Sequence, residues 1–135
     1  INGIKVLLLS PTTYMNHSGT SVRAACDFYK MSLRDVLIIC DDMNLPLGKL
    51  RFRGRGSSGG HKGLADIIRA MGTEEVPRLR IGIGKPPAGQ DSVRFVLSAF
   101  GREEEAVIRE AYRKAADAVE LWVAEGIEAS MGKFN

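Results

Sequence analysis

The chain alternates between short apolar runs and longer segments with a helical period, and this alternation predicts its elements. IKVLLL at 4–9 and VLIIC at 36–40 are continuous apolar runs of the kind found in buried strands. RLRIGIG at 78–84 has an apolar residue at every second position, and the inward alternation of Leu79, Ile81 and Ile83 predicts a third core strand. KLRFRGR at 49–55 alternates cations with apolar residues or glycine, which predicts a strand with one basic face.

Helical periodicity occupies most of the remaining chain. The spacing predicts helices over 18–31 and 61–71, the second ending at a glycine that favours a helix C-terminus. A short helical turn is expected over 91–97. The last helix is expected over 103–124, with acidic residues in its first turn and a buried apolar stripe of Val107, Ile108, Ala111, Ala115, Val119, Trp122 and Val123. Strand–helix alternation favours one layered α/β domain over residues 1–135, a mixed twisted sheet flanked by helices.

A glycine-rich segment, GRGSSGGHKGL at 54–64, carries the strongest chemical signal. Glycines let backbone amides approach a ligand closely, and a helix starting near His61 adds its positive end. The preceding strand adds a row of cations: Lys49, Arg51, Arg53 and Arg55. Together these features predict a site for an anion, such as a phosphate of a nucleotide or nucleic acid.

The charge distribution supports an acidic partner. The net charge of +3 conceals nine Lys/Arg against three Asp/Glu over 49–85, whereas 86–135 has a charge of −3. An acidic partner is therefore expected to bind the middle third of the chain. A solvated basic surface is the plainer alternative.

Composition narrows the class of protein. With 44% hydrophobic and 26% charged residues the chain has the composition of an ordinary soluble protein. No run approaches the roughly 18 apolar residues that a bilayer crossing needs. The two cysteines, Cys26 and Cys40, give neither a disulfide framework nor metal-ligand spacing, which favours a reduced, cytoplasmic protein.

Polar residues follow the predicted strands in three separate loops. Asn16, Asp41 and the pair His61 and Lys62 each come from a different loop, and polar groups converging from several loops are typical of a site. Each also has a plainer explanation. Asn16 fits an ordinary turn, Asp41 fits a loop cap, and His61 fits a helix cap. We assign Asp42 to a capping or solvent-facing role.

Four motifs, taken in order, resemble bacterial peptidyl-tRNA hydrolase. They are PTTYMNHSG at 11–19, DDMNLP at 41–46, GSSGGHKGL at 56–64 and RLRIGIGKP at 78–86. The resemblance covers almost the whole chain and implies that family's fold. It also implies hydrolysis of the ester between a peptide and the 3′ end of tRNA, by a monomer without metal or cofactor. Peptidyl-tRNA would be the partner, with recycling after release from ribosomes as the purpose.

The resemblance assigns roles to individual residues. Asn16 would bind substrate and position water, and Met15 would lie beside the scissile ester. Asp41 would orient the catalytic histidine, and His61 matches the histidine of the family's GGHNG loop. The tRNA backbone would contact Lys49, Arg51, Arg53, Arg55, Gly59 and Gly60.

Two departures from the family pattern qualify the resemblance. Lys62 replaces the asparagine that follows the loop histidine, and a lysine donates hydrogen bonds without accepting them. It suits an oxyanion or a phosphate in the substrate site. The family's catalytic histidine lies in an N-terminal segment that this sequence lacks, and neither His17 nor His61 aligns with it. We therefore expect a missing N-terminal portion and poor stability of residues 1–135 alone.

These departures keep a second function open. A non-catalytic RNA-binding homologue of the same fold would retain the binding groups without the catalytic base. An enzyme acting on a nucleotide or phosphate metabolite is a more distant third. The loop at 54–64 lacks both the Gly-Lys-Ser/Thr ending of a P-loop and the pattern of a dinucleotide site.

Overall fold

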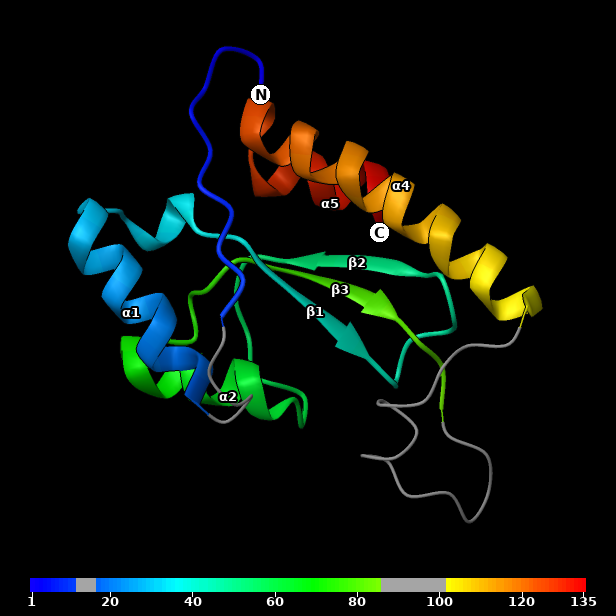
Figure 1. Ribbon diagram of the computed structural model, residues 1–135, viewed down its shortest axis with the longest axis horizontal. Helices are drawn as coiled ribbons and strands as arrows, with labels where there is room; N and C mark the ends of the chain where they lie inside the picture. The colour runs from blue at the N-terminus through cyan, green and yellow to red at the C-terminus, as the bar shows by residue number, and fades with distance from the viewer. Residues whose placement is uncertain (12–16, 86–101) are drawn as a thin grey trace. The chain divides into compact units, whose positions relative to one another are not determined.

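The computed structural model of the chain describes residues 1–11, 17–85 and 102–135 (Figure 1). Its elements, in chain order, are α1 (Ser18–Tyr29), η2 (Leu33–Asp35), β1 (Ile38–Asp42), β2 (Leu50–Arg53), α2 (Lys62–Met71), β3 (Arg78–Gly82), α4 (Arg102–Glu125) and α5 (Ile127–Phe134). The strands form one three-stranded sheet in the order β1-β3-β2. In Figure 1 β1 and β3 run the same way and β2 runs opposite, so the sheet is mixed. The predicted α/β class is confirmed.

The chain divides into two compact units, and we describe each by itself. The first comprises Ile1–Ile38 with Arg53–Leu79, and the second Ile39–Phe52 with Arg80–Asn135. The helical turn predicted at 91–97 lies outside the described residues.

The core of the first unit lies between α1 and α2. Val22 and Cys26 of α1 pack with Ile67 of α2 and with Val76 in one buried cluster. Burial raises the pKa of the Cys26 thiol, which keeps it protonated and unreactive. The helices predicted at 18–31 and 61–71 are confirmed, and Gly72 ends α2 with a positive φ of 72°.

The start of α1 sits directly against α2. The N–H of Gly19 donates to Oδ2 of Asp66 at 2.7 Å. A Cβ at Gly19 would lie 2.7 Å from that same oxygen and 2.8 Å from Cβ of Ala70. Only a glycine allows this approach, which is the reason for the motif's SG pair at the start of a helix.

The alternation predicted for the basic strand is confirmed within β2, which belongs to the second unit except for Arg53. Leu50 and Phe52 are buried, Arg51 is half-buried and Arg53 is exposed. Asn135, the C-cap of α5, bonds the outer edge of this strand through its side-chain amide. Its Oδ1 accepts the N–H of Phe52 at 2.6 Å, and its Nδ2 donates to the Phe52 carbonyl at 3.0 Å.

The last helix, predicted over 103–124, is confirmed as α4, and a shorter helix that was not predicted, α5, follows it. Gly126, with φ of 90°, separates α4 from α5. The buried residues of α4 are Ile108, Ala111, Ala115 and Ala118. The wider stripe predicted from the sequence is partly wrong, because Val107 is 45% exposed and Trp122 and Val123 are only half-buried.

The core strand predicted over 78–84 is confirmed over 78–82, and Leu79 and Ile81 are buried as predicted. Arg78 and Arg80 are buried as well, which the alternation did not indicate. The Arg78 guanidinium donates to the carbonyls of Gly56 and Ser57, and that of Arg80 lies 3.5 Å from the Asp42 carboxylate, so both buried charges have partners.

The strand predicted at 4–9 is wrong. Residues 4–9 form no strand in the structure, and their side chains are exposed, Leu8 to 88%. A strand requires a hydrogen-bonding neighbour, and the sheet that the structure describes contains only β1, β3 and β2. The strand predicted at 36–40 exists but is shifted, because it begins at Ile38 and includes Asp41 and Asp42. It is less buried than predicted, with Ile39 52% exposed.

Candidate functional site

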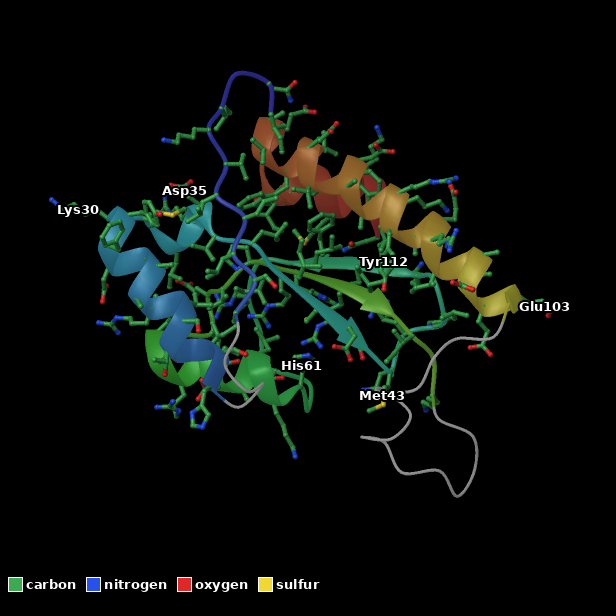
Figure 2. All side chains as sticks on the ribbon, in the orientation of Figure 1. Lys30, Asp35, Met43, His61, Glu103 and Tyr112 are labelled. Atoms are coloured by element: carbon green, nitrogen blue, oxygen red, sulfur yellow. The ribbon has the colours of Figure 1, made fainter. Side chains whose placement is uncertain are left out.

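One part of the candidate site lies in the first unit, where His61 stands at the start of α2 (Figure 2). Its Nδ1 accepts the backbone N–H of Leu64 at 3.0 Å, so the side chain is the N-cap of the helix. An accepting Nδ1 places the proton of the neutral ring on Nε2. The structure thus confirms the capping role, and a role in substrate binding stays a prediction.

The loop before His61 has a defined shape. Gly59 and Gly60 adopt positive φ of 60° and 85° and are both exposed. The N–H of His61 donates to the carbonyl of Ser58 at 3.2 Å, which closes the turn. Only glycines adopt these backbone angles without strain, which accounts for the sequence GSSGG.

Beneath this loop lies a buried guanidinium that was not predicted from the sequence. Arg78 is 1% exposed. Its Nη1 donates to the carbonyls of Gly56 at 2.7 Å and Ser57 at 3.0 Å. Its Nη2 donates to the carbonyl of Glu74 at 2.9 Å and its Nε to that of Val76 at 2.8 Å. The alternation of RLRIGIG places Arg78 on the face opposite Leu79 and Ile81, which is why its burial was not predicted.

Exposed cations surround the same loop. Lys62 is the first residue of α2 and is exposed, and the first turn of this helix contains no acidic residue. Arg53 and Arg55 are exposed as well, and Nη1 of Arg55 lies 3.7 Å from the Glu75 carboxylate. A lysine at a helix N-terminus opposes the helix dipole, so Lys62 does not stabilise α2 through its charge.

The second unit contains the acidic pair at the end of β1. Asp41 is half-buried. Asp42 accepts the N–H of Asn44 at 2.8 Å and lies 3.5 Å from Nη1 of Arg80, with its side chain 12% exposed. The predicted capping role of Asp42 is therefore confirmed, and the predicted solvent-facing role is wrong. Lys49, exposed, and Arg51, half-buried, also belong to this unit.

The candidate residues thus fall into two groups. Gly59, Gly60, His61 and Lys62 belong to the first unit, whereas Asp41 belongs to the second. Met15 and Asn16 lie outside the described residues. Over residues 1–11, 17–85 and 102–135 no group of three or more His, Cys, Asp or Glu is placed to hold a metal ion. In the same part of the chain no helix is long and apolar enough to cross a membrane.

Comparisons with known proteins give one consistent result. The profile of the family described as peptidyl-tRNA hydrolase matches residues 1–135. A peptidyl-tRNA hydrolase of Rhodopirellula baltica is 50% identical over 135 residues, covering 100% of this chain and 71% of the relative. One of Desulfitobacterium hafniense is 47% identical, covering 100% and 73%. Thus this chain spans less than three quarters of these relatives.

Solved structures agree with the sequence relatives. The crystal structure of peptidyl-tRNA hydrolase from Acinetobacter baumannii matches with a TM-score of 0.84 and 34% identity, over 93% of this chain and 63% of that chain. Its Arg119Gln mutant matches with a TM-score of 0.85 over the same shares.

Proposed function

Because the chain belongs to the peptidyl-tRNA hydrolase family, we propose that the protein hydrolyses the ester between a peptide and the 3′ end of tRNA. The family expected from the four sequence motifs is confirmed. The observation that carries the proposal is a match over every residue of the chain to relatives that bear this name. The alternative of a non-catalytic RNA-binding homologue finds no support in these comparisons.

The reaction requires a base, and Asp41 is the residue we propose to orient it. Water attacking an ester carbonyl must lose a proton as the bond forms, and an imidazole suits this at neutral pH. A carboxylate behind the imidazole fixes its tautomer and stabilises the imidazolium that develops. Asp41 is half-buried at the end of a strand, where partial exclusion of water strengthens such a hydrogen bond.

The residues around the glycine loop are proposed to bind the tRNA end of the substrate. The N-terminus of α2 carries partial positive charge that no acidic residue of its first turn offsets, and Lys62 adds a full charge there. His61, whose Nδ1 accepts a hydrogen bond from its own helix, is proposed to bind the substrate. Met15 and Asn16 are proposed to contact the ester, as the resemblance implies. The residues proposed to contact the tRNA backbone are Lys49, Arg51, Arg53, Arg55, Gly59 and Gly60.

The remaining assignments follow from the family and the thiol chemistry. We propose that the protein acts as a monomer in the cytoplasm and needs no metal or cofactor. The two cysteines, neither in a disulfide spacing nor in a metal-ligand spacing, support a reduced setting.

Replacing Asp41 by asparagine tests the proposed mechanism. In the protein expressed from its complete reading frame, Asp41→Asn should lower kcat by about a hundredfold or more, because the base loses its orienting charge. The KM for peptidyl-tRNA should change little. The measurement is release of labelled peptide from peptidyl-tRNA.

The matched control is Asp35→Asn, the same change at an exposed position of η2, which should keep full turnover. Undiminished turnover of Asp41→Asn would remove Asp41 from the mechanism. A wild-type protein that binds tRNA without turnover would instead favour the RNA-binding homologue.

A further inference from the structure

Arg78 is the fully buried cation of the first unit, and the hydrogen bonds described for it all run to main-chain carbonyls. Two of these carbonyls, of Gly56 and Ser57, belong to the glycine-rich loop. The other two, of Glu74 and Val76, belong to the segment that leads into β3. The guanidinium therefore joins the loop before α2 to the segment after it.

The loop needs such a link because its sequence gives it little order of its own. Residues 54–60 form neither helix nor strand, and Gly56 adopts a φ of 131°. Glycines lose more conformational entropy on ordering than any other residue. One further tie is the N–H of Gly56, which donates to the Glu74 carbonyl at 3.2 Å. Arg78 and this backbone bond hold the same end of the loop.

The other end of the loop is held by α2 itself. The N–H of His61 donates to the Ser58 carbonyl, and the His61 ring caps the helix at Leu64. Between these two ties stand Gly59 and Gly60, exposed at the apex. The guanidinium thus determines where the loop enters the turn that precedes His61 and Lys62.

We propose that Arg78 is a positioning residue for tRNA binding, an inference that rests on the proposed function. It does not contact the substrate. Its planar fork fixes the peptide groups after Gly56 and Ser57, so that the apex and the first turn of α2 are already arranged for the tRNA end. A lysine cannot replace it, because one ammonium cannot reach all of these carbonyls from a single point.

The experiment compares Arg78→Lys with the wild-type protein expressed from its complete reading frame. Amide hydrogen exchange over 54–61 should be faster in the variant, because the loop loses its link. The KM for peptidyl-tRNA should rise about tenfold while kcat changes less than about twofold, since binding and not chemistry depends on the loop. A merely structural role would lower the amount of active protein and leave KM unchanged.

Gly56→Ala perturbs the same link from the loop side and leaves the buried cation in place. Alanine is strained at a φ of 131°, so the loop should loosen and KM should rise as in Arg78→Lys. The KM of the double variant should be no higher than the larger KM of the two single variants, because both substitutions break the same link. Should Arg78→Lys fail to fold, the KM of Gly56→Ala decides alone.

The outcomes separate this inference from the proposed function. Faster loop exchange with unchanged KM would overturn the inference and leave the hydrolase function intact. Unchanged loop exchange in a folded Arg78→Lys would overturn it as well. A wild-type protein without turnover would end the proposed function, while its exchange data would still show whether Arg78 holds the loop.

Discussion

At the scale of single residues, Asp66 shows how one carboxylate joins two helices. It accepts Nη2 of Arg69 within α2 at 2.6 Å and the N–H of Gly19 at the start of α1 at 2.7 Å. The Arg69 hydrogen bond and then the Gly19 hydrogen bond hold the pKa of Asp66 below its ordinary value of 3.8. The ionised form is therefore the form that the folded chain prefers.

This preference predicts an acid-dependent contribution to stability. A depressed pKa stabilises the folded state at pH values above the unfolded pKa, and the contribution is lost as the pH falls through the lower, folded pKa. Asp66→Asn should therefore lower the denaturant midpoint at neutral pH. The difference from wild type should shrink below about pH 4. Denaturant titrations across this range provide the measurement.

Asp27→Asn is the control for this prediction. It makes the same change in an exposed pair with Arg23, and exposed pairs contribute about 1 kcal/mol or less. It should leave the midpoint nearly unchanged. A gap between wild type and Asp66→Asn that persists undiminished at low pH would contradict the linkage.

Residue-scale features were predictable where the cause lies nearby in the sequence. Gly72 as a helix end and His61 as a cap follow from residues within one turn of them. The burial of Arg78 and Arg80 was not predictable, because their partners, the carbonyls of Gly56 and Ser57 and the Asp42 carboxylate, lie far from them in the sequence. Alternation within one strand contains no information on which groups cover its two faces.

At the scale of elements, the amide of Asn135 completes the hydrogen bonding of β2. Asn135→Ala should lower the free energy of unfolding by about 1 kcal/mol, because the N–H and carbonyl of Phe52 lose their described partners. The free energy of unfolding of Asn135→Asp should lie between those of the wild type and Asn135→Ala. Aspartate keeps the acceptor for the Phe52 N–H and loses the donor to the Phe52 carbonyl. Thermal or chemical unfolding measures the stability of both variants. An Asn135→Ala protein as stable as the wild type would show that the two hydrogen bonds of Asn135 do not stabilise the fold.

The elements that were mispredicted share a dependence on distant partners. The run at 4–9 has the composition of a buried strand, yet a strand exists only where another strand pairs with it. The helix predicted over 103–124 is confirmed as α4, whereas α5, which begins after Gly126, was not predicted.

At the scale of the whole molecule, the excess of positive charge over 49–85 predicts salt-dependent binding of tRNA. The affinity should fall steeply as salt rises, because bound cations release counterions from phosphates. Arg53→Glu should weaken binding and reduce the slope of log Kd against log salt by about 1. Filter binding over a salt series measures both quantities.

Arg34→Glu supplies the same charge change at an exposed residue of η2 and is the control. Its effect on affinity should be small. Equal losses in the two variants would show that net charge alone governs binding. Unchanged affinity of Arg53→Glu would mean that its face is only solvated surface.

The family was predictable from sequence, whereas the geometry of the site was only partly so. The order and spacing of the motifs identify the peptidyl-tRNA hydrolase family, because each motif is a short run of neighbouring residues that can be recognised in the sequence itself. Which groups lie near Asp41 depends on the tertiary structure, and the spacing of residues along the sequence does not determine it. His61 shows the same limit, because one sequence pattern fits both a helix cap and a ligand.

The amide that Asn135 places on β2 has a consequence for behaviour in concentrated solution. An uncovered sheet edge is a template on which a strand from another molecule adds, the first step toward amyloid-like association. Here the outward N–H and carbonyl of Phe52 are already engaged by a side chain of the same molecule. The two hydrogen bonds that hold α5 to β2 therefore also hinder the addition of a strand from another molecule at this edge.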